Sequence, residues 1–400
     1  MGLKRPTILQ IIPELETGGA ELSAIEIAAA VVRAGGRAIV LSEGGRMADR
    51  LAAVGGELLP FPAATKNPVK LIANGATIAR IARKENVDLI HARSRAPAWS
   101  ALLAARQAKL PFVTTYHGIY NEKGRAKRLY NSVMARGDIV IANSRYTADI
   151  VKKRYAIPED RIRVIYRGVD LEAFDLAMVS PERIKKLRDR WGVADHQRVV
   201  LHAARLTKWK GQGDVIAAAA RLRNKISDCV FILAGDAQGR DDYRDTLLKQ
   251  IASAGVEDIV RLVGHVDDMP AAFAAAHTAI VASIEPEAFG RAAAEAQAMA
   301  CPVISTDIGA PPETVLAPPR VPETERTGWL VPPGDIAAYG AALLETLSLD
   351  GAARAATGYR AREHVKAAFS TFEMQRATLA VYDNLLTCEM EGTFLKMASA

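Results

Sequence analysis

Short strand patterns alternate with helical patterns along this chain, and the alternation runs through twice. In the first half, the β-rich segments Thr7–Ile12 and Arg37–Leu41 flank Ala20–Ala34, whose apolar residues recur at helical spacing. Strands that alternate with helices favour right-handed crossovers and therefore a parallel sheet. After a polar, charged stretch that runs to Arg190, the alternation restarts at Val199–Ala203. The chain is therefore predicted to be an α/β protein with two parallel sheets in tandem.

The length agrees with two domains, because 400 residues exceed the roughly 100 to 200 of one ordinary domain. Half of the residues are hydrophobic and 24% are charged, which is typical of globular proteins. The longest run without a charged residue, Met269–Ile284, has 16 residues, fewer than the roughly 20 that cross a bilayer. The first residues, Met1–Pro6, precede a strand pattern rather than the apolar block of a signal peptide. We therefore expect a cytoplasmic protein.

The cysteines and the acidic pairs predict neither a disulfide framework nor a metal site. Cys229, Cys301 and Cys388 lie far apart in the sequence and lack the spacing of zinc ligands, so we expect reduced thiols. The pairs Asp241-Asp242 and Asp267-Asp268 are interpreted as solvated loops rather than metal ligands.

Positive charge is concentrated in one part of the chain. Between Pro62 and Arg167 there are 21 Lys and Arg residues against 7 Asp and Glu residues. This stretch contains two dense groups of cations: Lys123, Arg125, Lys127 and Arg128, then Lys152, Lys153 and Arg154. No nucleic-acid-binding pattern accompanies them, so an anionic membrane surface or a phosphorylated lipid acceptor is the preferred partner, with an ordinary solvated helix face as the alternative.

Two glycines follow the first predicted strand, at the start of a helix. In Gly18-Gly19 the absence of side chains allows backbone amides to approach an anion at the positive end of that helix. A simple turn is the alternative. The glycine fingerprint of dinucleotide-binding proteins and the phosphate-binding loop of nucleotide hydrolases are both absent, which removes the main support for those functions.

Two cations follow the strand Val199–Ala203 on one loop. Arg205 and Lys210 are five residues apart, and such a pair can hold a diphosphate and neutralise the charge that grows on it as it leaves. Surface exposure alone explains either cation equally well.

A motif with two glutamates follows the strand predicted at Thr278–Ala282. Glu287 lies at the entrance of a helix, beside the free amides of Phe289 and Gly290, and Glu295 lies about two turns further on nearly the same face. One carboxylate can accept hydrogen bonds from sugar hydroxyls and the other from a ribose diol. For Glu295 alone, an ordinary surface carboxylate is the alternative.

Together these motifs resemble the GT-B glycosyltransferases of family 4, which transfer sugars from nucleotide sugars with retention of anomeric configuration. The resemblance covers nearly the whole chain and rests on the order and spacing of eight segments. They are Gly18–Glu21, Thr115–Gly118, Asn143-Ser144, Gly168–Asp170, Arg205 with Lys210-Gly211, Ala234–Asp236, Glu287 with Glu295, and Gly328–Asp335.

The resemblance implies a role for each matching residue. Arg205 and Lys210 would hold the donor diphosphate, Glu287 the transferred sugar, and Glu295 the ribose. Gly18 and Gly19 would close over the phosphates from the other domain, and Phe289 and Gly290 would complete the donor site. His117 would contact the sugar near the reacting carbon, which makes His117, Glu287, Arg205 and Lys210 the catalytic set; a hydrogen-bonded structural histidine is the alternative for His117. The chain departs from the family pattern at Ala204 and at Arg291, and the role of Arg291 stays open.

The resemblance also implies a domain arrangement and a mechanism. We expect a Rossmann-like acceptor domain over residues 1–180, a Rossmann-like nucleotide-sugar domain over 181–370, and a last helix over 371–400 that returns to the first domain, with the two domains facing across a cleft. Ligands of open parallel sheets bind beyond the carboxyl ends of the strands. We expect front-face displacement without a metal or other cofactor.

The acceptor is the least constrained part of the prediction. The segments His91–Arg95 and Tyr116–Tyr120 are similar to those of bacterial lipopolysaccharide-core sugar transferases. We therefore predict transfer of a hexose, with mannose as one candidate, to a lipid-linked or lipopolysaccharide-core glycan, by an enzyme that can associate with the inner face of the cytoplasmic membrane. The alternatives are a nucleotide-sugar 2-epimerase on the same fold and a catalytically silent, membrane-associated assembly protein. A nicotinamide-linked dehydrogenase comes last.

Overall fold

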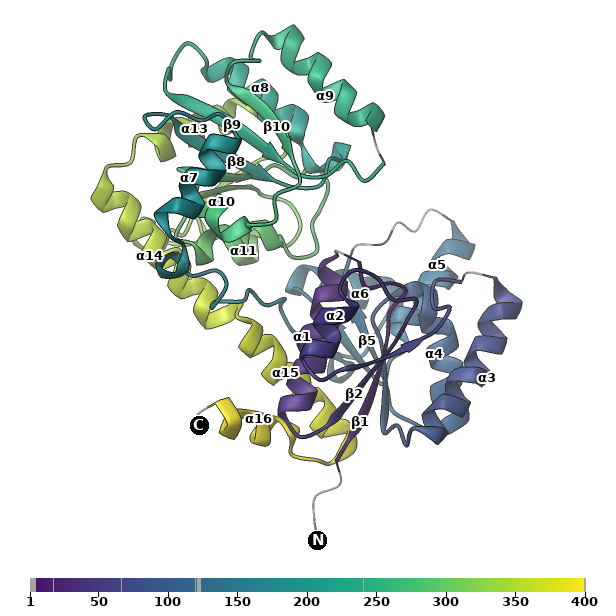
Figure 1. Cartoon of the computed structure of the whole chain (residues 1–400). Helices are drawn as coiled ribbons and strands as arrows, with labels where there is room; N and C mark the ends of the chain where they lie inside the picture. The colour runs from purple at the N-terminus through teal and green to yellow at the C-terminus, as the bar shows by residue number, and fades with distance from the viewer. Residues whose placement is uncertain are drawn as a thin grey trace. The chain divides into compact units, whose positions relative to one another are not determined.

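The computed structural model describes residues 5–16, 18–65, 67–118, 120, 124–239 and 241–398 (Figure 1). The chain divides into two compact units. The first unit comprises the chain up to Gly168 together with the residues from Thr371 onward, and the second unit comprises Val169–Ser370. The prediction of two parallel α/β sheets is confirmed.

The first unit is built on a sheet of seven parallel strands in the order β3-β2-β1-β4-β5-β6-β7. The strands are β1 (Thr7–Ile11), β2 (Arg37–Ser42), β3 (Glu57–Pro60), β4 (Leu89–Ala92), β5 (Phe112–Tyr116), β6 (Ile139–Ala142) and β7 (Ile162–Val164). Leu9 of β1 lies opposite Ile39 of β2 on one side and Ile90 of β4 on the other. The strand order reverses between β1 and β4, which makes the gap between these strands the topological switch point.

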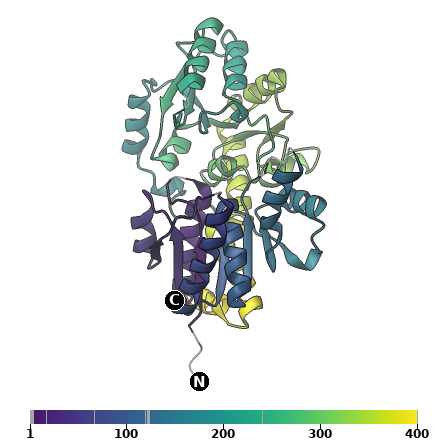
Figure 2. The same ribbon diagram turned by 90° about the vertical axis from the view of Figure 1, so that its right-hand side faces the viewer.

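Helices cover both faces of this sheet (Figures 1 and 2). One face packs on α1 (Gly19–Arg33), α2 (Ala48–Ala53), α15 (Thr371–Leu386) and α16 (Met390–Ala398). The other packs on α3 (Pro68–Lys84), α4 (Arg95–Ala108), α6 (Arg145–Tyr155) and the 3-10 turn η1 (Ser132–Ala135), which follows the short helix α5 (Arg125–Asn131). Successive strand residues supply the two cores in turn, because Ile8 packs on the first face and Leu9 on the second.

The sequence pattern predicts a frayed tail from Gly392 onward, and this prediction is wrong up to residue 398. The tail forms α16, in which Phe394 is 1% exposed and stacks on Phe372 with ring centroids 5.3 Å apart. The helix begins where it does because the carboxylate of Asp383 accepts hydrogen bonds from the amides of Met390 and Glu391, both at 2.8 Å.

The second unit is built on six parallel strands in the order β10-β9-β8-β11-β12-β13. The strands are β8 (Arg198–Ala203), β9 (Cys229–Ala234), β10 (Val260–Gly264), β11 (Thr278–Val281), β12 (Val303–Thr306) and β13 (Trp329–Val331). One face packs on α7 (Pro181–Arg190), α10 (Met269–Ala275) and α11 (Arg291–Ala298), and the other on α8 (Gln212–Leu222), α9 (Asp241–Ala254) and α13 (Ile336–Leu347). The short helix α12 (Pro311–Thr314) follows β12, and α14 (Gly351–Ala368) packs on α11. The switch point of this sheet lies between β8 and β11.

The polarity of the charged stretch before residue 190 predicts a linker, but this stretch belongs to the second unit. It forms α7, which Ser180 caps by accepting from the amide of Arg183, and Leu187 packs in the core. The guanidinium of Arg183 also donates to both carboxylate oxygens of Asp268 at 2.7 and 2.9 Å. The division between the units therefore falls after Gly168, twelve residues earlier than the pattern places it.

Within the described part of the chain, no helix is long and apolar enough to cross a membrane. All three cysteines are free thiols, with Cys229 and Cys301 buried in the second unit.

Candidate active site

The two predicted donor-binding motifs lie side by side at the switch point of the second unit. One follows β8 and the other follows β11, and these strands are neighbours in the sheet. The loops touch through their backbones, since the amide of Ile284 donates to the carbonyl of Trp209 at 2.8 Å. Gly211 adopts φ +73°, and a Cβ there would collide with the carbonyl oxygen of Ala282. Only glycine allows this approach of the two loops.

Lys210 and Glu287 form a largely buried ion pair at this place. The ammonium nitrogen of Lys210 donates to Oε1 of Glu287 at 2.7 Å, and the side chains are 17% and 9% exposed. The hydroxyl of Ser283 donates to the same carboxylate oxygen. The ammonium also lies 4.3 Å from the ring centroid of Trp209. Sequence reasoning missed Ser283, although its position directly after β11 was a usable signal.

The backbone of Glu287 is held by the loop that follows β12. The carbonyl of Glu287 accepts from the amide of Ala310 at 2.9 Å, and Glu287 forms an isolated parallel bridge with Gly309. Gly309 adopts φ +81°, and a Cβ there would lie 2.6 Å from both the nitrogen and the oxygen of Glu287. Three consecutive sheet loops therefore fix the position of this carboxylate.

Arg205 stands apart from this cluster. Its side chain is exposed, and within the described residues its guanidinium makes no hydrogen bond or ion pair. Its carbonyl accepts from the side-chain amide of Gln212 at 2.8 Å, which holds the loop. The structure thus gathers Lys210 with Glu287 and leaves the guanidinium of Arg205 in solvent, so its predicted hold on a diphosphate stays a prediction.

The start of α11 positions the remaining donor-site residues. Gly290 caps the helix in the left-handed conformation, and the ring of Phe289 is buried against Phe369. Glu295 accepts a hydrogen bond from Nε of Arg291 at 2.7 Å, and burial raises the pKa of its carboxyl group. Arg291, whose role the sequence left open, is therefore the ion-pair partner of Glu295.

A buried histidine lies beneath the Lys210 and Glu287 pair and was missed by the sequence analysis. His202 of β8 donates from Nδ1 to the carbonyl of Ile280 at 2.9 Å. Burial lowers the pKa of its imidazole to about 4, and the charges of Lys210 and Glu287 also act on it. His202 is therefore neutral at neutral pH, and it links the two strands that carry the ion pair.

A second cluster lies at the carboxyl ends of β5, β6 and β7 in the first unit. His117 follows β5, and Nη2 of Arg167 lies 3.1 Å from Nδ1 of its ring and 3.3 Å from its carbonyl oxygen. The side-chain amide of Asn143 donates to the same carbonyl. Burial, reinforced by the charges of Arg167 and Arg93, holds the pKa of His117 well below its usual range. His117 is therefore neutral at neutral pH.

Arg93 and His91 extend this cluster from β4. Arg93 is 4% exposed and donates from Nε to the side-chain oxygen of Gln10 at 2.8 Å. Both ring nitrogens of His91 are satisfied, one by the hydroxyl of Tyr382 at 2.6 Å and one by that of Thr115 at 2.7 Å. Residues 91–95 enter the prediction only through their resemblance, and no local pattern predicts that Arg93 is buried.

The predicted glycine pair caps α1, but an acidic side chain lies against it. Gly18 is the N-cap residue and Gly19 the first helical residue. A Cβ on Gly18 would collide with the carboxylate of Glu21, so this carboxylate covers the helix start. An anion can reach these amides only after Glu21 turns aside.

The predicted basic cluster is partly described. Arg125, Lys127 and Arg128 lie exposed on α5, whereas Lys123 falls outside the described residues. Nη2 of Arg128 donates to the carbonyl of Arg154 at 2.5 Å.

The residues that the structure describes contain no group of three His, Cys, Asp or Glu side chains placed to bind a metal ion. Asp268 lies in the loop before α10, as predicted, but it is only partly exposed to solvent. Its carboxylate caps α10 by accepting from the amide of Ala271 at 3.1 Å, and it also pairs with Arg183. That pairing lowers the pKa of Asp268.

Comparison with known proteins bears on this geometry. Residues 17–173 match the family model Glycosyltransferase Family 4, and residues 183–364 match the model Glycosyl transferases group 1. The chain is 33% identical in sequence to a glycosyltransferase from Rickettsia africae ESF-5 with a known crystal structure. The match covers 96% of this chain and 99% of the Rickettsia chain, and the two structures superpose with a TM-score of 0.87.

The chain is a group 1 glycosyltransferase. Its two sheets are those of the GT-B fold. This glycosyltransferase is also similar to HepE of Anabaena, solved in complex with UDP and glucose, with 27% identity, coverage of 94% and 99%, and a TM-score of 0.80. Among curated proteins it is 24% identical to N-acetyl-alpha-D-glucosaminyl L-malate synthase of Bacillus anthracis, over 80% of this chain and 81% of that one.

Proposed function

We propose that this glycosyltransferase transfers a hexose from a nucleotide sugar to an acceptor hydroxyl with retention of configuration. The observation that carries the proposal is the Lys210, Glu287 and Ser283 cluster at the switch point of the second unit. Ligands of doubly wound sheets bind at such points. The HepE structure, which is similar over nearly the whole chain, contains UDP and glucose, and this supports a UDP-sugar as the donor.

The cluster is suited to a donor that carries both charge and hydroxyls. Lys210 is a compact cation that can meet the diphosphate, and Glu287 is then free to accept hydrogen bonds from sugar hydroxyls. Arg205, exposed on the same loop, can add bidentate contacts to the phosphates. Glu295, held by Arg291, is the proposed acceptor of hydrogen bonds from the ribose.

In the proposed reaction the bond between the anomeric carbon and the diphosphate oxygen breaks while the acceptor oxygen bonds to the same face of the sugar. The acceptor proton passes to the departing phosphate oxygen, and the nucleoside diphosphate leaves. Retention through a glycosidase-like mechanism needs a nucleophilic carboxylate about 5 Å from an acid. Here Glu287 and Glu295 are already engaged by Lys210 and Arg291. Stabilisation of the leaving group by fixed cations therefore supplies the catalysis.

We further propose that the reaction needs no metal or other cofactor, because Arg205 and Lys210 supply the positive charge that a metal ion would bring to the diphosphate. Turnover is expected to be unchanged after treatment with excess chelator. A loss of turnover that Mg²⁺ or Mn²⁺ restores would contradict this part of the proposal.

For the acceptor we propose a lipid-linked or lipopolysaccharide-core glycan, with mannose as a candidate sugar and the exposed face of α5 as the membrane contact. On this face Leu129 is 60% exposed among Arg125, Lys127 and Arg128. Replacing these three cations with Gln is expected to reduce sedimentation with vesicles that contain anionic lipid, relative to the wild type. Unchanged sedimentation would leave α5 as an ordinary solvated helix.

The donor half of the proposal can be tested by calorimetry with UDP, after a thermal-shift screen of UDP, GDP and ADP sugars. Lys210→Ala is expected to weaken binding of the nucleoside diphosphate at least tenfold, whereas Lys249→Ala, an exposed lysine of α9 in the same unit, should bind like the wild type. Equal affinities for the two variants would remove Lys210 from the donor site. Incubation with the donor alone separates transfer from 2-epimerisation, and failure to bind any nucleoside diphosphate would favour a non-catalytic assembly protein.

A further inference from the structure

The ammonium group of Lys210 has two attractive partners of different kinds. Its nitrogen donates to Oε1 of Glu287 at 2.7 Å and lies 4.3 Å from the ring centroid of Trp209. The face of an indole ring carries negative charge density, and among aromatic side chains tryptophan attracts a cation most strongly. The side chain of Lys210 is only 17% exposed, so water screens neither attraction fully. The indole therefore contributes to the position of this ammonium group, as the carboxylate does.

The backbone of Trp209 is anchored independently of the ion pair. Trp209 lies in the middle of the 3-10 turn η4 (Lys208–Lys210), and its carbonyl accepts from the amide of Ile284 in the loop after β11. Directly after the turn, Gly211 packs so closely on the carbonyl of Ala282 that no side chain fits between them. Both the turn and the residue that follows it are therefore fixed against the neighbouring strand, and so is the start of the indole side chain.

Lys210 is singled out among the cations of its loop. Arg205 and Lys208 are exposed, and within the described residues neither side chain forms an ion pair or lies over an aromatic ring. A solvated lysine keeps the rotamer freedom of its four-carbon stem, whereas two partners restrict that freedom in Lys210. The loop therefore orders one cation and leaves the other two exposed.

Donor binding affects the two partners of Lys210 unequally. In the proposed function the carboxylate of Glu287 accepts hydrogen bonds from the transferred sugar, while Lys210 meets the diphosphate. The indole has no competing partner, because the side chain of Trp209 forms no hydrogen bond or ion pair with any residue that the structure describes. A cation that keeps one fixed partner loses less conformational freedom when it binds the phosphates than one that has lost both.

We propose that Trp209 is a positioning residue, whose indole keeps the ammonium of Lys210 beside the diphosphate after Glu287 turns to the sugar. This inference rests on the proposed function, which assigns the diphosphate to Lys210. The effect of Trp209 passes through Lys210 and depends on an aromatic face. A phenyl ring at this position therefore preserves the effect, and an aliphatic side chain removes it.

The direct test measures UDP binding to the full-length protein by calorimetry. Trp209→Leu is expected to weaken the affinity by about three- to tenfold, as the loss of a partly buried cation-π contact would. Trp209→Phe should stay within about twofold of the wild type, because it keeps an aromatic face. Tyr359→Leu is the control, since Tyr359 is an exposed aromatic residue of α14 in the same unit, and it should bind like the wild type. Equal affinities of the wild type and Trp209→Leu would overturn the proposal.

A second variant keeps the test decisive if Trp209→Leu does not fold. Trp209→Met occupies part of the same space with a flexible side chain that has no aromatic face, and it should weaken UDP binding by a similar factor. Thermal melting followed by circular dichroism shows whether each variant is folded. A role in packing alone predicts equal losses of affinity in Trp209→Phe and in the folded aliphatic variant, and that result would overturn the proposal.

A double-mutant cycle separates positioning from direct contact with the nucleotide. Lys210→Ala removes the cation through which Trp209 acts, so the further change Trp209→Leu should weaken UDP binding by less than about twofold. A direct stacking contact between the indole and the uracil predicts the full loss with and without Lys210, and that result would overturn the proposal.

The same measurements distinguish failure of this inference from failure of the proposed function. If the wild type and Trp209→Leu bind UDP equally well, the donor site stands and only the role of Trp209 is removed. If the wild type binds none of UDP, GDP and ADP, the proposed function fails, and the inference that rests on it fails too. If GDP or ADP binds in place of UDP, the same series of variants is measured with that nucleotide.

Discussion

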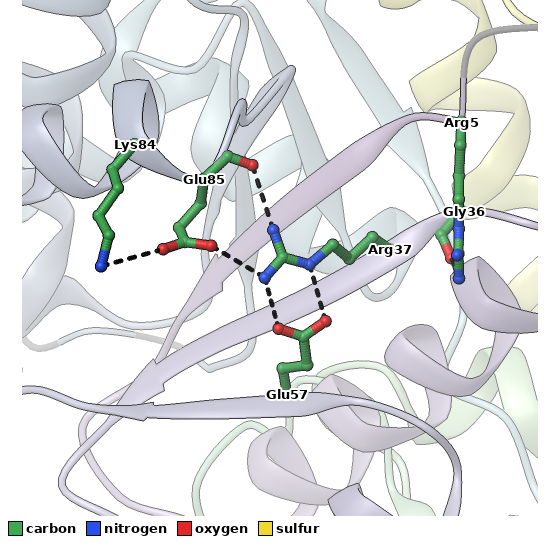
Figure 3. Close-up of polar contacts among 6 residues, drawn as sticks. All are labelled: Arg5, Gly36, Arg37, Glu57, Lys84 and Glu85. Carbon is green, nitrogen blue, oxygen red and sulfur yellow. Dashed lines mark hydrogen bonds and ion pairs between the residues drawn. The ribbon is translucent and has the colours of Figure 1, made fainter.

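The first sheet has an arginine at each end of its strands, and the two arginines differ in their charged partners. The amino ends of the strands form the amino edge and their carboxyl ends form the carboxyl edge. At the amino edge, Arg37 at the start of β2 donates to both carboxylate oxygens of Glu57 at 2.6 and 2.7 Å and to Glu85 at 2.9 Å (Figure 3). These contacts raise the pKa of Arg37 and lower that of Glu57. At the carboxyl edge, Arg93 has only neutral hydrogen-bond partners, and burial lowers its pKa.

Burial makes this difference informative. The side chain of Arg37 is 30% exposed and pairs with two carboxylates, whereas Arg93 is 4% exposed and forms no ion pair with any residue that the structure describes. Stability alone would favour the reverse, because the need for a counter-ion grows with burial. The charge of Arg37 is therefore neutralised within the fold, whereas that of Arg93 is not neutralised by an ion pair among the described residues. The second unit differs from the first in this respect, because Arg198 pairs with Asp228 at its amino edge and Lys210 pairs with Glu287 at its carboxyl edge.

The largest expected effect is on kcat, and it should be seen for a variant at the carboxyl edge of the second unit but not for one at its amino edge. Glu287→Gln should lower kcat by about 10²- to 10³-fold, because it removes the charge that orders Lys210 and the sugar. It should also lower the melting temperature, because Lys210 is then largely buried without a counter-ion. Asp228→Asn should lower the melting temperature and leave kcat close to that of the wild type. Steady-state kinetics and calorimetric melting of both variants check this. A Glu287→Gln enzyme with near-normal turnover would contradict the assigned role.

Two separate glycines, Gly309 and Gly334, test whether the backbone position of Glu287 matters for stability and transfer. Gly309→Ala should destabilise the protein by about 2 to 3 kcal/mol and reduce transfer, because its Cβ would press on the backbone of Glu287. Gly334 also has positive φ but has no atom within 4 Å of an added Cβ, so Gly334→Ala should cost only about 1 kcal/mol and preserve activity. Chemical denaturation and kinetics measure both. Equal losses of stability and activity in the two variants would show that only the strain of the left-handed backbone matters, and not the contact with Glu287.

Arg37 and Arg93 can be compared directly through the free energy of unfolding of their variants. Arg37→Gln should reduce the free energy of unfolding by about 1 to 2 kcal/mol, since it breaks a partly exposed network of two ion pairs. Arg93→Gln should leave that free energy unchanged or raise it, because it removes a buried charge that has no counter-ion. Urea denaturation, followed by circular dichroism, measures both values. A larger loss for Arg93→Gln than for Arg37→Gln would make Arg93 a structural residue.

The smallest effect is a pH dependence. The pKa of His202 is lowered to about 4 in the folded protein, so between pH 6.5 and 4 the unfolded chain binds a proton there that the folded chain does not. Stability is therefore complete above about pH 6.5 and falls as the pH drops, by about 1 kcal/mol between pH 6.5 and 5.5 from this group. His202→Gln should flatten this part of the stability curve. An unchanged slope would show that His202 titrates normally.

Much of the fold and part of the site could be predicted from the sequence because they depend on local patterns. The alternation of strands and helices predicts both sheets, and strand ends locate Lys210 and Glu287 before their contact is known. The contact itself spans 77 residues and depends on β8 and β11 being neighbours, which no local pattern records.

The failures have equally specific causes. Leu187 of α7 and Trp191, directly after this helix, are the main core residues of a stretch dominated by charge, so its average polarity resembles that of a linker. The tail was read as frayed because the carboxylate that caps α16, that of Asp383, lies in the preceding helix. Arg93 looked like one cation among many, since burial depends on how α15 covers the strand ends.

The first unit is formed by two segments that are separated in the sequence by the whole second unit, so it cannot be completed until the end of the chain has been synthesised. Ribosomes produce the chain from the amino terminus, so the entire second unit emerges before Tyr382 is available to His91 and Leu379 can cover its share of the sheet. Until then the nascent first unit exposes an apolar surface that α15 and α16 later bury, and such a surface promotes aggregation. A chain that ends before α15 is for the same reason expected to leave the first unit without part of its core.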